Sequence, residues 1–380
     1  MTDSLLELIL WGSLLFLGYT YLGYPVILAL WSWLGRKPVV RRPVTPKVTI
    51  VIAAWNETER LAARIENCLH QEYPAELLDI VVVSDGSTDH TETVVRRFDS
   101  RRVRLMKLAS RNGKAAALNW GVAAASGEII VFADTRQRFA PDAVARLVSN
   151  FGDPDVGAVS GELVLGSSLG REGTDGVGLY WRIEKWIRQK EGEIDSVIGA
   201  TGAIYAIWRE LFRPLPPGAI LDDVLVPMRI AMRGYRVVFE QRALAFDRLT
   251  ESYRSEFRRK VRTLAGNYQA ISLCPDLITP WRNRLFFQYV SHKLCRLVAP
   301  FALIALLLCN VALMEGWLSY LLVAQAVGYG LALAGWGLAR LGVRERWTSA
   351  AFAFCFLNYA ALIGAIRFAR RDHALWRKAS

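Results

Sequence analysis

Long apolar runs lie towards both ends of the chain, and a segment of mixed apolar and polar residues separates them. The first run covers residues 5–34 and contains one charged residue, Glu7. Further runs follow at about 295–314, 317–338 and 349–366. Because about 20 apolar residues cross the hydrocarbon core of a bilayer, each run is a candidate membrane helix. The pattern predicts a membrane anchor, then a more polar domain, then a membrane cluster.

The first run is predicted to be an uncleaved transmembrane helix. It is longer than the apolar core of a signal peptide, lacks a basic start and shows no clear cleavage site. A cleaved or interfacial segment is the alternative. Acidic residues precede the run and basic residues follow it, which places the polar domain in the cytoplasm. These residues are Asp3 before the run and Glu7 at its start, and Arg36, Lys37, Arg41 and Arg42 after it.

The last apolar run, at 349–366, has arginines on both sides. Both flanks favour the cytoplasm, and a single crossing cannot place both there, so a re-entrant or interfacial placement is favoured. Residues 281–293 mix basic and aromatic residues, which is typical of an amphipathic helix on the membrane surface. Residues 179–191 have apolar residues at helical spacing, which fits a helix packed on its own domain or one on the membrane surface.

These patterns divide the chain. We expect an N-terminal transmembrane helix at 1–35, a cytoplasmic domain at 36–275, an interfacial amphipathic segment at 276–293, and a C-terminal membrane region at 294–380 with two or three apolar segments.

The cytoplasmic domain alternates predicted strands and helices. The strands are 48–54, 79–85, 103–108 and 128–134, and the helices are 56–71, 87–98 and 113–125. Asn56 is the expected N-cap of the first helix. Apolar strands without alternation, separated by helices, predict an α/β fold with a mostly parallel sheet between helices. Ligands bind beyond the carboxyl ends of such strands, and Asp85 and Asp134 each end one.

Composition narrows the function classes. Hydrophobic residues make up 53% of the chain, and 47 Lys and Arg against 35 Asp and Glu give a net charge of +12. Much of the excess charge flanks the apolar runs and no nucleic-acid motif appears, so a nucleic-acid partner is not expected. The 5 cysteines have no CxxC spacing, which excludes a Cys-rich zinc site or disulfide scaffold. The absence of GxxxxGK[ST] and GxGxxG argues against P-loop and dinucleotide-binding domains.

Ordered motifs in the cytoplasmic domain read VTIVIAAWNE, DIVVVSDGSTDHT, GKAAALNWG, GEIIVFAD, GATGAIYAIWR and LDDVLVPMRIAMRGYRV. They resemble family 2 glycosyltransferases, which adopt the GT-A fold, over about residues 45–270. The membrane layout is similar to the branch that contains cellulose, hyaluronan and chitin-oligosaccharide synthases. The resemblance implies a membrane-embedded hexosyl- or N-acetylhexosaminyltransferase that uses a nucleotide-sugar donor, with a UDP-sugar expected.

The resemblance assigns donor-binding positions. Asp85 corresponds to the carboxylate that holds the uracil or ribose, and a helix cap before Ser87 is the alternative. Ala53 and Glu57 flank the loop that touches the nucleotide, although Glu57 also suits a helix start. Lys114 is placed to meet phosphate or the base edge, and an ordinary surface lysine is the alternative.

Asp134 corresponds to the first carboxylate of the DxD motif, which binds a divalent ion, Mg²⁺ or Mn²⁺, that bridges the diphosphate. Here the motif reads Asp134-Thr135-Arg136, so an arginine stands at the second ligand position. An arginine cannot bind a cation but can neutralise a diphosphate. Either Asp134 keeps a metal site with another ligand, or Arg136, with Arg138, takes over part of the role of the metal.

Asp223 corresponds to the general base, which takes the proton of the acceptor hydroxyl as its oxygen attacks the anomeric carbon. A helix cap is the alternative. This single displacement inverts the configuration of the sugar. The resemblance implies that the acceptor binds at Gly199, Thr201 and Gly202, with Asp222 as the neighbouring carboxylate.

Processive members carry a QxxRW motif, whose arginine contacts diphosphate and whose tryptophan stacks on the acceptor sugar. Arg259, Arg262 and Thr263 stand at these positions here. We expect Arg259 and Arg262 to contact the donor diphosphate, with anionic lipid headgroups as the alternative. Without the tryptophan, limited addition is favoured over long-chain synthesis.

The expected acceptor is a membrane-proximal saccharide or polyprenyl-linked saccharide in cell-surface polysaccharide synthesis. The expected location is a bacterial-type inner (plasma) membrane, in contact with its lipids. An inactive glycosyltransferase-like scaffold of a polysaccharide assembly is the alternative, since Arg136 interrupts the metal motif. The carboxylates Asp85, Asp134 and Asp223 argue for an enzyme.

Overall fold

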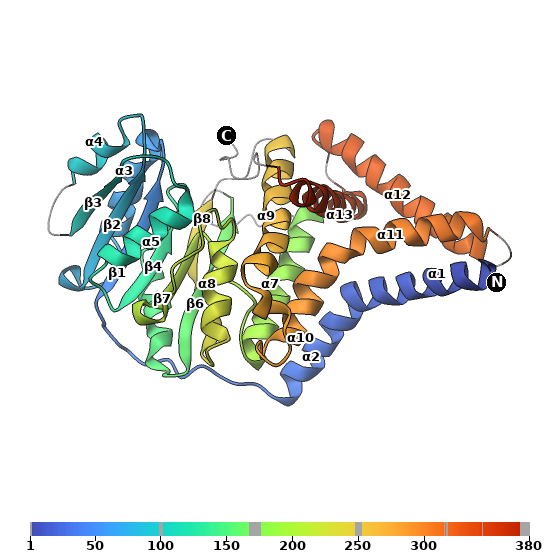
Figure 1. Ribbon diagram of the computed structural model, residues 1–380, viewed down its shortest axis with the longest axis horizontal. Helices are drawn as coiled ribbons and strands as arrows, with labels where there is room; N and C mark the ends of the chain where they lie inside the picture. Colours follow the sequence, from blue (N-terminus) through green and yellow to red (C-terminus); the bar gives the residue numbers. More distant parts are fainter. Residues whose placement is uncertain are drawn as a thin grey trace.

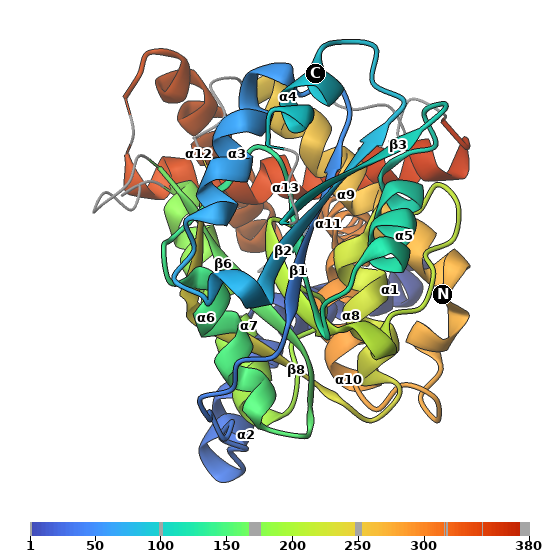
Figure 2. The same cartoon turned by 90° about the vertical axis from the view of Figure 1, so that its left-hand side faces the viewer.

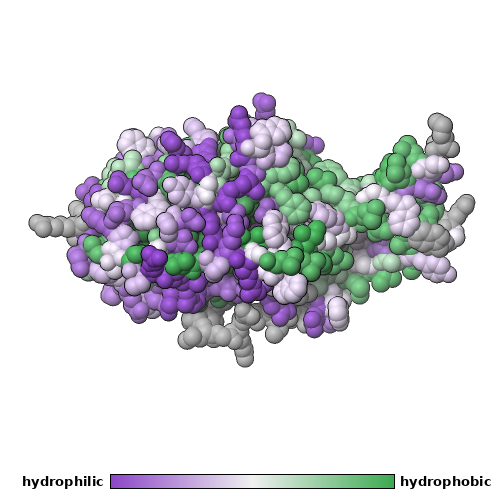
Figure 3. Space-filling view, turned by 90° about the horizontal axis from the view of Figure 1, so that it is seen from below, coloured by the Kyte–Doolittle hydropathy of each residue, from purple (hydrophilic) through white to green (hydrophobic). Residues whose placement is uncertain are grey.

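The computed structural model describes residues 2–98, 102–166, 176–247, 253–314, 316, 318–343 and 345–372. A domain of strands and helices lies at one end of the molecule, and long helices extend from it to the other end (Figure 1). Hydrophilic residues cover the first part and hydrophobic residues cover much of the second (Figure 3).

The sheet domain is built on one mixed sheet. In the described part of the chain the sheet has 8 strands, in the order β3-β2-β1-β4-β7-β6-β8-β5. The strands are β1 (Val48–Ala54), β2 (Leu78–Asp85), β3 (Val103–Leu108), β4 (Ile129–Ala133), β5 (Arg138–Phe139), β6 (Val156–Leu165), β7 (Ile204–Trp208) and β8 (Arg236–Asp247). Strand β1 pairs in parallel with β2 and β4, whereas β7 is antiparallel to β4 and β6. The predicted α/β fold with a mostly parallel sheet is confirmed.

Helices cover both faces of the sheet, as Figure 2 shows. The helices of this domain are α3 (Thr58–Leu69), α4 (Thr91–Arg96), α5 (Lys114–Ala124), α6 (Ala143–Val148), α7 (Gly176–Ile194), α8 (Asp222–Ala231) and α9 (Tyr253–Leu273). Apolar residues of α3, α4 and α6 pack on one face, and those of α5 and α8 pack on the other. Gly121 lets α5 approach closely, since a Cβ there would lie 2.4 Å from Val51 Cγ1.

Asn56 is not the N-cap of α3, so that prediction is wrong. Its backbone has a φ of 51°, and its side-chain oxygen accepts a hydrogen bond from the Thr88 N–H at 2.9 Å. Glu57 occupies the N-cap position instead. Asn56 therefore joins the loop after β1 to the loop after β2.

The remaining helices are α1 (Thr2–Gly18), α2 (Tyr24–Leu34), α10 (Phe286–Tyr289), α11 (Cys295–Ala312), α12 (Leu318–Arg340) and α13 (Arg346–Ala369). One π-helical turn, η1 (Tyr19–Gly23), joins α1 to α2, and another, η6 (Val290–Leu294), joins α10 to α11. Both long helices bend near these turns (Figure 1). Among the described residues, 4 helical segments are long and apolar enough to cross a membrane: Asp3–Leu34, Phe286–Ala312, Leu318–Arg340 and Arg346–Ala369.

Helix α13 lies crosswise to α1 and α11. It is foreshortened in Figure 1 and seen along its length in Figure 2. It packs against α9, where a Cβ on Gly364 would lie 3.1 Å from the Ala265 nitrogen and 3.2 Å from the Val261 oxygen. This position between the sheet domain and the long helices suits an interfacial helix, and the membrane boundaries of the chain remain predictions.

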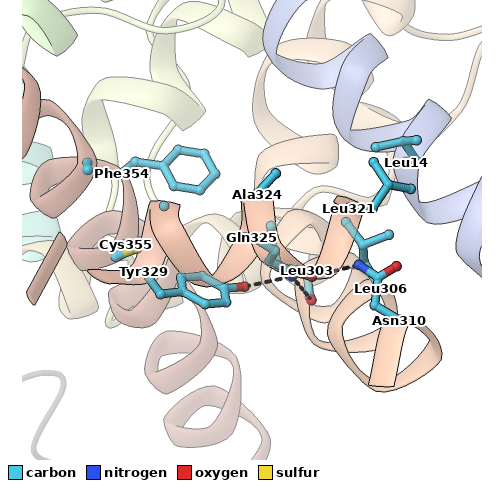
Figure 4. Close-up of a pocket in the computed structure, with 12 residues that line it drawn as sticks. Leu14, Leu303, Leu306, Asn310, Leu321, Ala324, Gln325, Tyr329, Phe354 and Cys355 are labelled. Carbon is cyan, nitrogen blue, oxygen red and sulfur yellow. Dashed lines mark hydrogen bonds between the residues drawn. The ribbon is translucent and has the colours of Figure 1, made fainter. Parts of the chain in front are cut away.

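A cavity of about 350 Å³ lies among α1, α11, α12 and α13. Figure 4 shows that mostly apolar side chains surround it. Asn310, Gln325 and Tyr329 form a hydrogen-bonded row on one wall, with Asn310 donating to Gln325 at 2.9 Å and Gln325 donating to Tyr329 at 3.0 Å. The row pairs the Asn310 and Gln325 amide nitrogens, which would be costly to bury unpaired, whereas Asn310 Oδ1 is buried without a partner in the described part of the chain.

Candidate active site at the carboxyl edge of the sheet

The predicted carboxylates come from strand ends and from a helix start at one edge of the sheet. Asp85 ends β2 and Asp134 follows β4, and both strands run parallel to the β1 strand between them. Asp222 and Asp223 form the first turn of α8, where a helix N-terminus favours negative charge. The parallel pairing thus gathers the carboxylates that the chain separates.

Lys114 joins two of these carboxylates. Its Nζ lies 2.9 Å from Asp134 Oδ1 and 3.2 Å from Asp222 Oδ1. Burial alone would lower the pKa of Lys114, but the surrounding Asp134, Asp222 and Asp223 carboxylates raise it above its ordinary value. Lys114 is therefore a charged lysine at the centre of the site, and the alternative of an ordinary surface lysine is wrong.

Asp223 lies against the predicted acceptor loop. Its backbone oxygen accepts a hydrogen bond from the Ala200 N–H at 2.6 Å. Burial and the neighbouring Asp222 charge raise the pKa of Asp223 to about 6, and Lys114 and Lys293 oppose the rise. Leu221 holds the N-cap position of α8, so Asp223 does not cap the helix. A carboxylate with a pKa near neutrality is suited to accept a proton.

The absence of a side chain at Gly202 makes room for this carboxylate. A Cβ on Gly202 would lie 2.7 Å from Asp223 Oδ2. We expect Gly202→Ala to displace the carboxylate and to lower kcat by about ten- to a hundredfold, since a displacement of about 1 Å can cost 10²-fold. Steady-state transfer kinetics measure this effect.

Gly192→Ala is the matched control, because a Cβ on Gly192 in α7 would make only ordinary contacts at 3.6 Å. Its kcat should equal that of the wild type. Equal kcat values for Gly202→Ala and Gly192→Ala would contradict the packing of Asp223 against Gly202.

Two neighbouring residues of this site were missed from the sequence. The Tyr205 hydroxyl donates to Asp222 Oδ2 at 3.2 Å, and the Tyr205 ring stacks on Phe132 with centroids 4.5 Å apart. Arg188 of α7 donates to Thr201 Oγ1 at 2.9 Å and to Ser160 Oγ at 2.8 Å. The contacts of Tyr205 and Arg188 join residues that are far apart in the sequence, so local spacing could not predict them.

Asp85 holds the loop before α5. Its Oδ1 accepts from the Asn112 N–H at 2.7 Å, and its Oδ2 accepts from the Gly113 N–H at 2.8 Å. Asp85 therefore does not cap a helix that begins at Ser87, because its carboxylate binds the loop before α5 instead. Each carboxylate oxygen has a second lone pair, so Asp85 can still accept a hydrogen bond from a ligand.

The loop after β1 borders the same edge. Ala53 is half-buried, and Glu57 is buried at the start of α3 with Oε2 3.8 Å from Arg60 Nη1. The Glu57 N–H donates to Thr91 Oγ1 at 2.8 Å. The guanidinium of Arg111 stacks 3.6 Å above the Trp55 ring beside this loop. Glu57 holds the N-cap position of α3 without a side-chain cap hydrogen bond, and both its donor contact and its role at the helix start stay predictions.

Arg136 turns towards the end of β8. Its Nη2 lies 2.6 Å from Asp247 Oδ2, and Gln137 Nε2 donates to the same oxygen at 2.9 Å. Asp247 is only 4% exposed. The arginine of the interrupted metal motif therefore has a structural partner.

We expect Arg136→Ala to lower the free energy of unfolding by about 1–3 kcal/mol, because it leaves a buried carboxylate short of a partner. Arg138→Ala removes an exposed arginine and should change this free energy by less than about 0.5 kcal/mol. Thermal or chemical unfolding compares the two variants. Equal stability of both would show that the contact with Asp247 contributes little.

Asp134 can serve as a metal ligand, although its Oδ1 pairs with Lys114 in this structure. Among the described residues, no group of three His, Cys, Asp or Glu side chains could hold a metal ion. Mg²⁺ in phosphate sites is commonly held by one or two carboxylates together with the phosphates. The single, partly exposed Asp134 fits that mode, with the donor diphosphate as the other ligand.

Arg259 and Arg262 lie on α9. Arg259 pairs with Glu256 on the same helix, and Arg262 is half-buried with no partner for its buried Nε in the described part of the chain. Of the predicted site residues, Asp134 and Asp222 form ion pairs with Lys114, and Asp223 acts on its charge. The donor contacts of the two arginines stay predictions.

Comparisons with known proteins find similarity to glycosyltransferases. Residues 49–213 match the family model "Glycosyl transferase family 2". A poly-β-1,6-N-acetyl-D-glucosamine synthase of Staphylococcus aureus (strain COL) is 24% identical over 267 residues, which cover 68% of this chain and 63% of that protein. A probable glycosyltransferase of Bacillus subtilis (strain 168) is 25% identical over 253 residues, 64% of this chain and 60% of that protein. The chain thus spans less than two thirds of these curated relatives.

A solved structure has the same fold over nearly the whole chain. It is a mannosyltransferase from Pyrobaculum calidifontis in complex with GDP-Man and Mn²⁺, with a TM-score of 0.74, 24% identity, and coverage of 97% of this chain and 100% of that one. The expected GT-A fold is confirmed by this likeness. The family model and the relatives support a family 2 glycosyltransferase domain within the chain, over the residues 49–213 that the model matches.

Proposed function

We propose that this chain is a membrane-embedded inverting glycosyltransferase. It moves a sugar from a nucleotide-sugar donor to a membrane-proximal acceptor in cell-surface polysaccharide synthesis. The observation that carries the proposal is the Asp223 carboxylate, with its pKa raised to about 6, beside the Lys114 ion-pair cluster. The name of the Staphylococcus aureus relative supports an N-acetylhexosamine as the sugar. A UDP-linked donor is what the resemblance of the motifs implies.

In the proposed reaction an acceptor hydroxyl attacks the anomeric carbon of the donor. Asp223 takes the hydroxyl proton as the new C–O bond forms. The bond to the nucleotide diphosphate breaks, and the diphosphate leaves with the bonding electrons. Attack opposite the leaving group inverts the anomeric configuration, so an α-linked donor gives a β-linked product.

Lys114 would stabilise the charge of the departing diphosphate, because it already lies between the donor-side and acceptor-side carboxylates. A Mg²⁺ or Mn²⁺ ion held by Asp134 and the diphosphate would supply further positive charge. Asp85, Ala53 and Glu57 lie at the same edge and would contact the nucleoside. Gly199, Thr201 and Gly202 would border the acceptor on the other side of Asp223.

We place the protein in the inner (plasma) membrane with its sheet domain in the cytoplasm, where nucleotide sugars are found. The apolar helices and the basic residues after the first of them support this orientation. The pairing of Arg136 with Asp247 gives the interrupted DxD motif a structural explanation, so this motif no longer favours an inactive scaffold.

Purified full-length protein in nanodiscs tests the proposal. UDP-GlcNAc, UDP-glucose and GDP-mannose are supplied separately with Mg²⁺, Mn²⁺ or EDTA, and the released nucleotide is measured with and without membrane-extract acceptors. Release from one donor, lost in Asp223→Asn, is expected. Binding of a donor without release under any of these conditions would support a scaffold instead.

A further inference from the structure

A charged helix face joins the candidate active site to the long helices. Glu184, Arg188 and Glu191 lie at successive turns of α7 and therefore share one face. This face packs against η6, at the start of α11. His292 of η6 contacts both glutamates: its Nδ1 lies 2.8 Å from Glu191 Oε1, and its Nε2 lies 2.8 Å from Glu184 Oε1.

The two glutamates of this face are already neutralised. Both nitrogens of His292 face carboxylate oxygens, so the ring donates from both and carries a positive charge. Arg296 pairs with Glu184, and the Tyr24 hydroxyl donates to Glu191 Oε1 at 2.7 Å. We call the set Glu184, Glu191, His292 and Arg296 the α7 clamp.

Two cations beside the α7 clamp lie near carboxylates but form no ion pair with one among the described residues. Arg188 donates hydrogen bonds to the hydroxyls of Thr201 and Ser160. Among the described residues, no acidic side chain lies within 4.0 Å of its guanidinium. Lys293 follows His292 in η6, is half-buried, and has neither an ion pair nor a hydrogen bond in the described part of the chain. Carboxylates of Glu184, Glu191 and Asp223 act on both cations only from beyond ion-pair distance. An anion between the two cations would give them direct charge-assisted hydrogen bonds.

The position of these cations points to the acceptor side of the site. Arg188 holds Thr201, whose loop encloses Asp223 through Gly199 and Gly202. The ammonium of Lys293 is close enough for its charge to act on Asp223. An anion at Arg188 and Lys293 would therefore lie on the side of Asp223 that faces the long helices.

We propose that the acceptor is a saccharide carried on a lipid phosphate, an inference that rests on the proposed function. Arg188 and Lys293 bind the phosphate, and the sugar next to it presents its hydroxyl to Asp223. A charged phosphate suits two cations better than a neutral polysaccharide does, since each charge-assisted hydrogen bond is about twice as strong as a neutral one.

The helices leave a place for the lipid tail. Lys293 lies at the domain end of α11, and Leu303 on the same helix borders the apolar cavity shown in Figure 4. Ten residues of helix separate them, which is about 15 Å at about 1.5 Å per residue. A phosphate bound at Lys293 can thus place its hydrocarbon chain towards this cavity.

The chemistry of transfer is unchanged. The sugar hydroxyl of the lipid-linked acceptor forms the new C–O bond, its proton goes to Asp223, and the nucleotide diphosphate leaves. The lipid phosphate forms no bond in this step. It positions the hydroxyl.

Lys293→Met tests the proposal, since Lys293 has no partner to lose within the described chain. Two acceptors are compared in neutral phosphatidylcholine nanodiscs: a prenyl-diphosphate GlcNAc and an alkyl GlcNAc glycoside without phosphate. We expect kcat/KM for the diphosphate acceptor to fall about ten- to a hundredfold. The assays are run well above pH 6, where Asp223 is ionised in both proteins, so transfer to the alkyl glycoside and donor hydrolysis should change less than about threefold. Lys293→Arg should retain most of the activity.

Lys37→Met is the matched control, because Lys37 is an exposed lysine just after α2 at the same end of the long helices. It should not distinguish the two acceptors. Equal losses on both acceptors in Lys293→Met, or no loss on either, would overturn the proposal. A loss that appears only when phosphatidylglycerol is added, with either acceptor, would identify a bulk lipid headgroup as the ligand and would also overturn it. Activity on the alkyl glycoside would keep the proposed transferase function intact in each case.

Discussion

Asp223→Asn is expected to lower sugar transfer by about 10²- to 10⁴-fold, the usual contribution of a general base. Asparagine keeps the size of the side chain but cannot take the proton of the acceptor hydroxyl. Donor binding should change little, because the predicted donor contacts lie at Asp85, Lys114 and Asp134. Transfer kinetics and calorimetric titration with the donor separate the two effects.

The wild-type rate should also depend on pH through this group. Asp223 acts as a base only when ionised, so kcat/KM should rise with pH through about 6 and level off above it. Asp276→Asn, which alters an exposed partner of Arg282, is the control and should keep both the rate and the pH profile. Turnover at the wild-type rate in Asp223→Asn would exclude Asp223 as the base.

Lys114→Met should have the second-largest effect, a loss of about 10²- to 10³-fold in kcat. The variant leaves the Asp134, Asp222 and Asp223 carboxylates without the ammonium that lies among them. Because Lys114 opposes the rise in the pKa of Asp223, its removal should shift the acid limb of the pH profile to higher pH. The pH dependence of kcat/KM measures this shift.

Lys114→Arg keeps the positive charge and should leave the acid limb near its wild-type position, even where its rate is lower. An unchanged acid limb in Lys114→Met would contradict the electrostatic coupling between Lys114 and Asp223. The two substitutions thus separate the charge of the lysine from its exact shape.

The strands of the sheet were predictable because their patterns are local. The apolar runs at 48–54 and 103–108 correspond to β1 and β3 with the same bounds. Asn56 was not predictable in this way. Its sequence position fits a helix cap, but its tertiary contact with Thr88 takes it out of that position.

The site was predictable where family motifs marked it, and not elsewhere. The motifs marked Lys114 and Asp134, whose ion pair the structure then supplied. The partner of Arg136 is Asp247, which lies far along the chain and in no motif. His292 likewise contacts glutamates from a distant helix. Long-range pairing of charged side chains leaves no periodic pattern that a sequence could reveal.

Helix α13 illustrates the limit for the membrane part. Its apolar length alone fits a membrane crossing, whereas its arginine flanks favour the interface. Gly364 of α13 packs against α9, and α13 lies crosswise to the other long helices; both features support the interfacial placement. Hydropathy measures how apolar a helix is but does not determine the direction of the helix, which depends on the helices that pack against it.

The anomeric configuration of the product tests the central claim most directly. The purified protein is given its α-linked nucleotide sugar and acceptor, and the configuration of the first new linkage is read from the NMR coupling of its anomeric proton. A β-linkage is predicted, because the acceptor activated by Asp223 displaces the diphosphate in a single inverting step. An α-linkage would contradict this mechanism.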